Sequence, residues 1–288
     1  MCFIVLQSSN NLNSLLQKPY EMSDEVAAKP SEGISIVPVS TTDVSSLVRV
    51  HTAAFKLDLF SILMVANREE NAHQNHMRKS IEFWMSDPDS QLVQAVDADG
   101  EIVGWSCWVL KGADKTVPAA AKSSSSPKPT LDVVPSTSVK AQEAAEGGPT
   151  AGPEASAMPQ APEPKTSQDT SRVLGGRMYE DMVQWEAEHT KGREYLVLQA
   201  LATDPRFQRR GIGTKLLQWG IDKADAGDLP CWTHASPASY TLYERVGFQE
   251  VGKSDYDLDE YAPGGRGGNR GWGRYTFRYM LRPSRGSV

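Results

Sequence analysis

The spacing of apolar and polar residues predicts both strands and helices in the N-terminal third of the chain. Residues 33–40 alternate as a half-buried strand does, and residues 41–55 place apolar side chains near helical spacing. Residues 57–86 are expected to be mostly helical. Residues 91–111 hold two β-rich runs around an Asp-Gly pair, which tolerates the positive φ of a tight turn, so they predict a hairpin.

The C-terminal part mixes the same elements in another order. We expect a helix at residues 177–192, followed by an almost continuously apolar run at 194–204 that is typical of a central strand buried on both faces. A strand is expected at 229–236, a short helix at 236–248 and a last strand at 273–282. The pattern indicates one α/β domain, and the hairpin makes its sheet mixed.

Composition changes abruptly between these two parts. Residues 112–172 contain no aromatic residue and no isoleucine, and such a segment cannot bury enough apolar surface to offset the entropy of ordering it. We therefore expect 112–172 to be a disordered insertion, either tolerated at the surface or regulatory through its Ser and Thr residues. It would separate residues 33–111 from residues 173–288 of one domain, and residues 1–32 would form a flexible tail.

Charge and cysteine content narrow the class of protein. A formal net charge of −6 does not suit a nucleic-acid binder. Three cysteines (Cys2, Cys107 and Cys231) are too few for a disulfide framework, and no His/Cys cluster has metal-ligand spacing, so no metal is expected. No apolar run approaches the ~18 residues of a membrane helix. We expect a cytoplasmic protein, with the nucleus as second option, that is a monomer or a homodimer without nucleic-acid or membrane partners.

A glycine motif follows the apolar run at 194–204. Residues 208–213 read QRRGIG and precede a segment whose small and apolar positions share one helical face. The first turn of a helix exposes unpaired N–H groups and the positive end of the dipole, and glycine lets an anion approach the backbone closely. The motif therefore predicts a phosphate cradle, with positive charge added by Arg206, Arg209 and Arg210.

Two common phosphate motifs fit this stretch less well. A nucleoside-triphosphate loop needs Lys-Ser or Lys-Thr after its second glycine, which is missing, and a dinucleotide fingerprint needs a third glycine where Leu216 stands. Taken alone, the motif also fits a structural turn with incidental arginines.

Together with its surroundings, the motif resembles the GCN5-related N-acetyltransferase (GNAT) superfamily. The likeness rests on the Leu-Ala-Thr-x-Pro strand end at 201–205, the Gln-x-x-Gly-x-Gly after it, and SPASYTLYERVGF at 236–248. It covers residues 33–110 and 173–282, and the chain is similar in particular to small fungal GNAT-domain proteins. The resemblance implies a mixed, mostly antiparallel twisted sheet with flanking helices and a splayed central pair of strands.

The resemblance also implies acetyl-CoA as co-substrate. Backbone groups of Leu201, Ala202 and Thr203 would bind the pantetheine arm. Ser236 stands where many relatives carry an asparagine that touches the cofactor, although Ser236 and Pro237 also fit an N-cap and a first helical turn. The diphosphate would be held by the loop residues Gln208, Arg209, Arg210, Gly211, Ile212, Gly213 and Thr214.

By the same resemblance, Tyr243 would lie near the cofactor sulfur and protonate the leaving thiolate. A tyrosine is a proton donor at neutral pH, so the residue type suits this role. Tyr240, one helical turn earlier, is the alternative. The Leu201 N–H would stabilise the oxyanion.

The general base is less evident. Many relatives carry Glu or His where this chain has Val197 and Gln199, and neither side chain can take a proton from an ammonium. Gln199 could hold a water that does, and His234 and Glu194 are the nearest titratable alternatives. An acetyl-enzyme on Cys231 is conceivable, but a buried strand cysteine is the better interpretation, so direct transfer is expected.

The substrate pocket is expected between the helices at residues 44–86 and the final strands. An aromatic lining that includes Phe55, Phe60 and Trp84 would favour a small, partly apolar amine, although most such residues also fit a plain core. The sequence thus predicts a small-molecule N-acetyltransferase acting on a primary amine. A protein or peptide N-acetyltransferase and a non-catalytic acyl-CoA-binding module are the alternatives.

Overall fold

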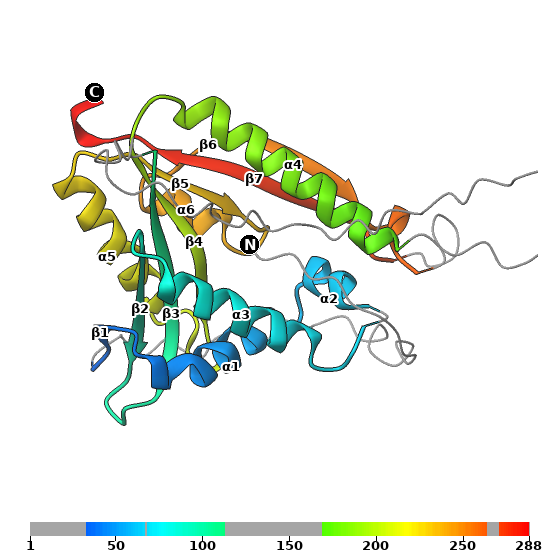
Figure 1. Ribbon diagram of the computed structural model, residues 1–288, viewed down its shortest axis with the longest axis horizontal. Helices are drawn as coiled ribbons and strands as arrows, with labels where there is room; N and C mark the ends of the chain where they lie inside the picture. The colour runs from blue at the N-terminus through cyan, green and yellow to red at the C-terminus, as the bar shows by residue number, and fades with distance from the viewer. Residues whose placement is uncertain (1–32, 67, 113–168, 264–270, 288) are drawn as a thin grey trace, which may run out of the picture. The chain divides into compact units, whose positions relative to one another are not determined.

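The computed structural model describes residues 33–66, 68–112, 169–263 and 271–287 (Figure 1). The expectations for residues 1–32 and 113–168 lie outside the described residues. The strands are β1 (Ser35–Pro38), β2 (Ser90–Val96), β3 (Ile102–Lys111), β4 (Tyr195–Thr203), β5 (Cys231–Ala235), β6 (Gln249–Asp257) and β7 (Arg274–Arg282). The α-helices are α1 (Val44–Ala54), α2 (Leu59–Val65), α3 (Ala72–Ser86), α4 (Thr170–Thr190), α5 (Ile212–Ala226) and α6 (Tyr240–Arg245).

The strands form one sheet in the order β1-β2-β3-β4-β5-β7-β6. All neighbouring pairs are antiparallel except β4 and β5, which run parallel. The expected mixed, mostly antiparallel sheet is therefore confirmed. The sequence pattern misses β6, because only Tyr256 of this edge strand is buried and its Gly, Lys and Asp residues lack the alternation of a half-buried strand.

The expected helices are present, and one of them begins earlier than expected. The stretch 57–86 is mostly helical, as expected, and consists of two helices, α2 and α3, with a break between them. α4 begins at Thr170, where the Asp169 carboxylate accepts a hydrogen bond from the Arg172 N–H and caps the helix. The last three residues of the expected insertion therefore form the first turn of α4.

The first half of the sheet is covered on both faces. α1 and α3 pack on β2, β3 and β4, and α5 packs against the same strands from the opposite face (Figure 1). Trp105 and Cys107 of β3 belong to the core beneath α1 and α3, whereas Trp108 belongs to the core beneath α5, as alternation along a strand requires. The Trp105 indole N–H donates to the Leu47 carbonyl at 3.0 Å, which fixes α1 on the sheet.

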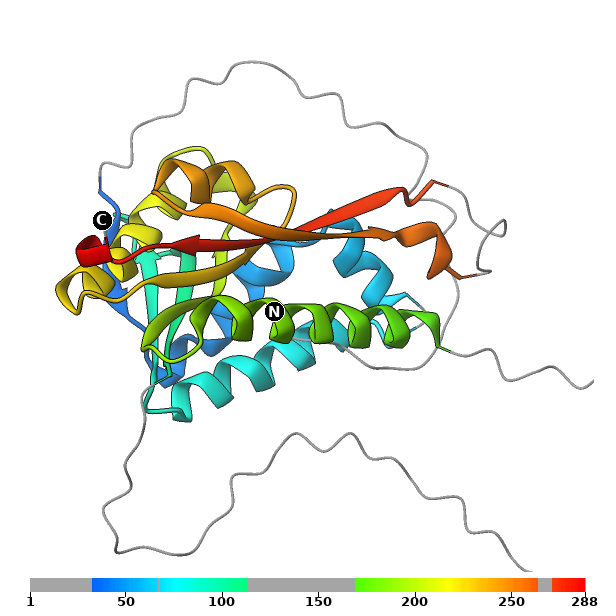
Figure 2. The same cartoon turned by 90° about the horizontal axis from the view of Figure 1, so that it is seen from above.

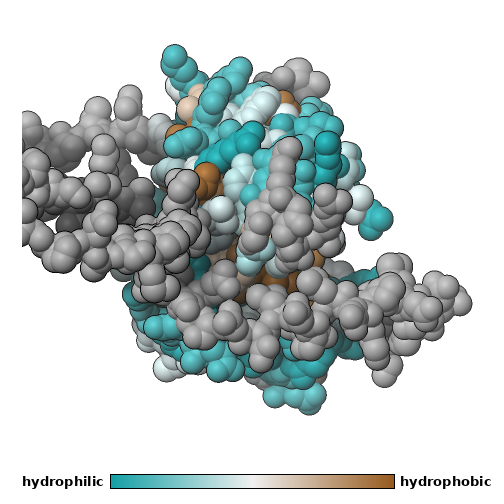
Figure 3. Space-filling model, turned by 90° about the vertical axis from the view of Figure 1, so that its right-hand side faces the viewer, coloured by the Kyte–Doolittle hydropathy of each residue, from teal (hydrophilic) through white to brown (hydrophobic). Residues whose placement is uncertain are grey.

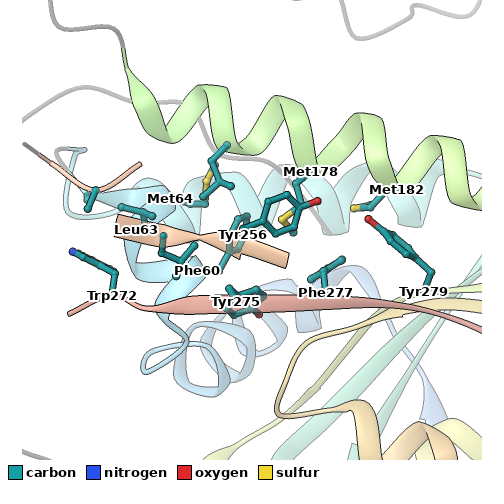
Figure 4. Packing of buried hydrophobic residues seen from close by; sticks show 14 of the residues in the cluster. Phe60, Leu63, Met64, Met178, Met182, Tyr256, Trp272, Tyr275, Phe277 and Tyr279 are labelled. Carbon is teal, nitrogen blue, oxygen red and sulfur yellow. The ribbon is translucent and has the colours of Figure 1, made fainter. Parts of the chain in front are cut away.

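The second half of the sheet has its own core. α4 lies along β5 and β7 (Figure 2). Figure 4 shows Met178 of α4 and Phe60 of α2 packed with Tyr256 of β6 and with Tyr275 and Phe277 of β7. The two halves of the sheet join at the β4–β5 pair, where Val197 of β4 packs in the same core as Trp232 of β5.

The described residues contain neither a membrane-spanning helix nor a cluster of metal-binding side chains. No helix in this part of the chain combines the length and the apolar character needed to cross a membrane. No group of three or more His, Cys, Asp and Glu side chains in it could hold a metal ion.

Candidate active site

β4 and β5 separate after two residue pairs, Leu196 with Cys231 and Val197 with Trp232. Beyond them the ladder between these strands ends, and Figure 1 shows β4 running steeply while β5 runs across it. The Thr233 hydroxyl donates to the Leu198 carbonyl at 3.1 Å where the strands part. The splayed central pair is therefore confirmed, and it opens the sheet beside the second half of β4.

A β-bulge at Gln199 exchanges the faces of the sheet on which the later residues of β4 lie. The β3 ladder passes from Ala200 directly to Leu198, so Gln199 has no residue opposite it. Leu198 packs in the core beneath α5, whereas Ala200 packs beneath α1 and α3, although a regular strand would put both on one face. In consequence Gln199, Ala200 and Leu201 all line one pocket.

The pocket at the divergence joins both halves of the sheet. Its lining comes from α1, α2 and α3 and from β4, β5, α6 and β7, and it contains no Asp, Glu, Lys or Arg among the described residues. Figure 3 shows a patch of hydrophobic side chains on a mainly hydrophilic face. The aromatic lining residues are Phe55, Phe60, Trp84, Tyr243 and Phe277.

Tyr243 reaches this pocket from α6 and is only 5 % exposed. Burial raises its pKa to about 12, and hydrogen bonds with Ser239 and Thr233 oppose that rise. Its hydroxyl therefore keeps its proton at neutral pH, as a proton donor must. Tyr240 does not line the pocket, because its hydroxyl donates to the Glu244 carboxylate at 2.6 Å on the surface.

His234 also lines the pocket, from β5. Its ring stacks on Phe277 with centroids 5.9 Å apart, and its Nε2 is buried without a hydrogen-bond partner among the described residues. Burial holds the pKa of His234 well below its usual range. The imidazole is therefore neutral at pH 7.

The pocket is also lined by three histidines that the sequence analysis did not single out. His51 comes from α1, and His73 and His76 come from α3. The His51 Nδ1 and the His73 Nε2 are 3.1 Å apart, within hydrogen-bond distance. The i, i+3 spacing of His73 and His76 could have indicated a shared helix face, but only the packing of α1 on α3 brings His51 to them.

The glycine motif leads from β4 into α5 in the expected place. Arg209 has φ +62° and Gly211, the N-cap of α5, has φ +81°. Gly211 has no side chain to cap this helix, so the N-cap residue leaves the first N–H groups of α5 unpaired. A Cβ on Gly213 would lie 3.2 Å from the Leu242 side chain, so glycine keeps this approach open. Ile212 is buried and can offer an anion only its backbone.

The three arginines near this loop differ in their surroundings. Arg206 forms salt bridges with two carboxylates. Its Nη2 lies 2.8 Å from the Asp204 Oδ2 and 2.5 Å from the Glu101 Oε1, so its charge is already paired. Arg210 lies over the Phe207 ring, and Arg209 is exposed. Only Arg209 and Arg210 are therefore available to an anion at the start of α5.

Ser236 is a pocket residue but not the cap of the following helix. α6 begins at Tyr240 with Ser239 at its N-cap, and the Ser236 carbonyl accepts hydrogen bonds from the N–H groups of both. The capping prediction is therefore wrong, because a turn precedes the helix. Contact of Ser236 with the cofactor stays a prediction.

Two of the titratable alternatives lie away from the pocket. Glu194 is exposed ahead of β4, and Cys231 is fully buried in the core beneath α5. Burial raises the pKa of the Cys231 thiol to about 12, which opposes a thiolate nucleophile.

A match to a known domain indicates an acyltransferase of the N-acetyltransferase type. Residues 176–250, from α4 into β6, match the family model for the acetyltransferase (GNAT) domain. This part of the chain carries the likeness to GNAT acetyltransferases, and acetyl-CoA is the co-substrate of that family. No curated protein matches the sequence.

Several solved structures are similar to this chain at low sequence identity. Arylalkylamine N-acetyltransferase 2 from Aedes aegypti is 14% identical with a TM-score of 0.53, covering 88% of this chain and 99% of its own. The histone acetyltransferase HPA2 and related acetyltransferase from Corynebacterium glutamicum is 17% identical with a TM-score of 0.46, covering 88% and 97%. NAA60 from Arabidopsis thaliana, in complex with a bisubstrate analogue, is 12% identical with a TM-score of 0.42, covering 88% and 99%.

Proposed function

We propose that this protein transfers the acetyl group of acetyl-CoA directly to the primary amine of a small molecule. The observation that carries the proposal is the uncharged pocket where β4 and β5 part, lined by Tyr243 and Leu201 together. A thioester lying along the free edge of β4 would present its carbonyl to an amine held in this pocket.

The binding of acetyl-CoA would rest on backbone groups. Leu201, Ala202 and Thr203 follow the point where β4 loses its β5 partner, so that edge of the strand can hydrogen-bond the pantetheine arm. The loop 208–214 would hold the diphosphate through the N–H groups at the start of α5. The Gln208 amide donates to the Thr203 carbonyl at 3.0 Å, which couples the loop to the strand end.

The reaction would proceed without an acetyl-enzyme. The amine nitrogen forms a bond to the acetyl carbon while the carbon–sulfur bond breaks, and the Tyr243 hydroxyl gives its proton to the departing sulfur. The Leu201 N–H would stabilise the oxyanion. The nitrogen loses a proton to a water beside Gln199 or to His234, whose Nε2 is buried without a partner.

The lining favours an amine with one charged group and an apolar body. Aromatic faces and the methionines Met64 and Met77 would bury the apolar part. A second ammonium would enter a pocket without any acidic lining residue and would lose its hydration without compensation. For the same reason a lysine-rich peptide, which an acidic groove would favour, is the second choice.

A panel of amines tests the proposal. The full chain is incubated with acetyl-CoA and each amine, and thiol release and the acetylated product are followed together. We expect turnover with arylalkylamines and much less with diamines or lysine peptides. If acetyl-CoA binds by calorimetry and none of the amines is acetylated, the protein is instead a non-catalytic acyl-CoA-binding module.

A further inference from the structure

Four of the five histidines of the chain line the one pocket described above. The fifth, His189, lies elsewhere, with its Nδ1 3.0 Å from the Trp185 carbonyl. In the part of the chain that the structure describes, the pocket lining has no carboxylate, and its histidines are the only lining groups there that can take up a proton near neutral pH. The question is which of them can also pass a proton on.

His51 and His73 are the two that contact each other. The His51 Nδ1 and the His73 Nε2 are 3.1 Å apart, so one nitrogen carries the shared hydrogen and the other accepts it. In either arrangement, one outer nitrogen of the pair has a lone pair and the other carries a hydrogen. A proton taken up at the first outer nitrogen can therefore leave as a different proton at the second.

The pair is held in this geometry by its neighbours. The His51 ring stacks on Phe55 with centroids 4.4 Å apart and an angle of 20° between the planes, and the His73 ring stands perpendicular to it. Trp105, anchored to the Leu47 carbonyl, lies 6.0 Å from His51 between centroids. Such packing leaves the rings little freedom to flip away from each other.

The charged groups around the pair leave it neutral at pH 7. Burial, together with His73 and His76, holds the pKa of His51 well below its usual range. Burial also lowers the pKa of His73, and the Asp58 carboxylate opposes this. Asp58 is itself engaged, since it accepts hydrogen bonds from the Ser61 and Tyr275 hydroxyls.

His76 lines the same pocket, and burial, His73 and Lys79 lower its pKa to about 4, so this ring is neutral as well. The pair is therefore bordered by one satisfied carboxylate and one neutral imidazole.

We propose that His51 and His73 form a proton relay that carries the ammonium proton of the substrate out of the pocket. The proposal rests on the acetyl transfer proposed above and assigns the step for which β4 supplies no acid or base. The N–H bond of the substrate breaks and an N–H bond forms at the outer nitrogen of His51. The Nδ1 hydrogen then passes to the His73 Nε2, and the outer nitrogen of His73 releases its proton to water.

Two isosteric variants test the relay. His51→Asn keeps a polar atom at the Nδ1 position, and His73→Gln keeps one at the Nε2 position, so each retains the contact but cannot relay a proton. We expect kcat/KM to fall about 100-fold in either variant, the lower bound for acid–base catalysis. The double variant should be no worse than either single one, and the affinity for acetyl-CoA should not change. His189→Gln is the control and should keep the parent activity.

The pH profile and chemical rescue separate a relay from a structural role. In the two variants, the pH dependence of kcat/KM should lose the step caused by histidine titration and should follow only the pKa of the amine substrate. Added imidazole should restore activity to the His51→Ala variant. Nitrogen NMR of the imidazoles should show the pair taking up a single proton in the parent.

Unchanged kinetics and pH profiles in both variants, with an active parent, would overturn the relay and leave the acetyl transfer standing. Independent titration of the two rings would overturn it too. No turnover in the parent would instead overturn the proposed function and the relay together.

Discussion

Gly220 of α5 lies directly against the indole ring of Trp108 on β3, so close that a Cβ at position 220 would overlap the ring. Trp108 is 1% exposed and cannot move aside. The contact sets how near α5 approaches the sheet, and α5 carries the glycine loop at its N-terminus. Gly220 therefore sets both the distance of α5 from the sheet and the position of the glycine loop.

Gly220→Ala should lower the free energy of unfolding by about 1–3 kcal/mol, because overpacking outweighs the better helix propensity of alanine. Gly176→Ala in α4 is the matched control, since no atom lies within 4 Å of a Cβ there. It should stabilise the protein by about 1 kcal/mol. Denaturant unfolding of both variants measures these changes. If Gly220→Ala unfolds with the same free energy as the parent, a Cβ at position 220 does not overlap the Trp108 ring.

Gly211→Ala should weaken acetyl-CoA binding as well as the fold. Its φ of +81° costs an L-residue about 1–2 kcal/mol, and relaxing that strain would reorient the N–H groups at the start of α5. Gly192, with φ +77° and open space around it, is the control outside the loop. Gly192→Ala should cost similar stability and leave the affinity unchanged. Calorimetry with acetyl-CoA distinguishes the two, and equal affinities would argue against the loop as the diphosphate site.

Tyr243→Phe should lower kcat about 100-fold while acetyl-CoA binding stays near the parent value, because only the proton donor is removed. Tyr240→Phe removes the hydroxyl that donates to Glu244 on the surface and should leave turnover unchanged. Turnover by Tyr243→Phe at the parent rate would exclude the proposed proton donor.

Acid should destabilise the protein through its pocket histidines. Burial lowers the folded-state pKa of His51, His76 and His234 below the ordinary 6.5, for His76 to about 4. Between pH 6.5 and 4 the unfolded chain therefore binds more protons than the native protein, and the free energy of unfolding falls as the pH falls. Urea unfolding at pH 7 and pH 5 measures the loss, which should be smaller in His76→Gln.

The best-predicted parts are those whose signal is local. The apolar run of β4, the glycines before α5 and the Asp-Gly hairpin each follow from their own few residues, and all three lie where expected. The histidine pair could not be found this way, because His51 and His73 are 22 residues apart and meet only through the packing of α1 on α3. The paired state of Arg206 likewise depends on Glu101, a residue distant in sequence.

The bulge at Gln199 has a consequence for insertions and deletions. Leu198 lies opposite Trp108 and Ala200 lies opposite Cys107, so removing residue 199 would leave a regular ladder with Ala200 and Leu201 on their present faces. One residue inserted after Ala200 and taken up by the ladder would instead exchange the faces of Leu201 and of every residue after it, at the strand end on which catalysis is proposed to depend. β4 therefore tolerates a change of length at the bulge better than beyond it.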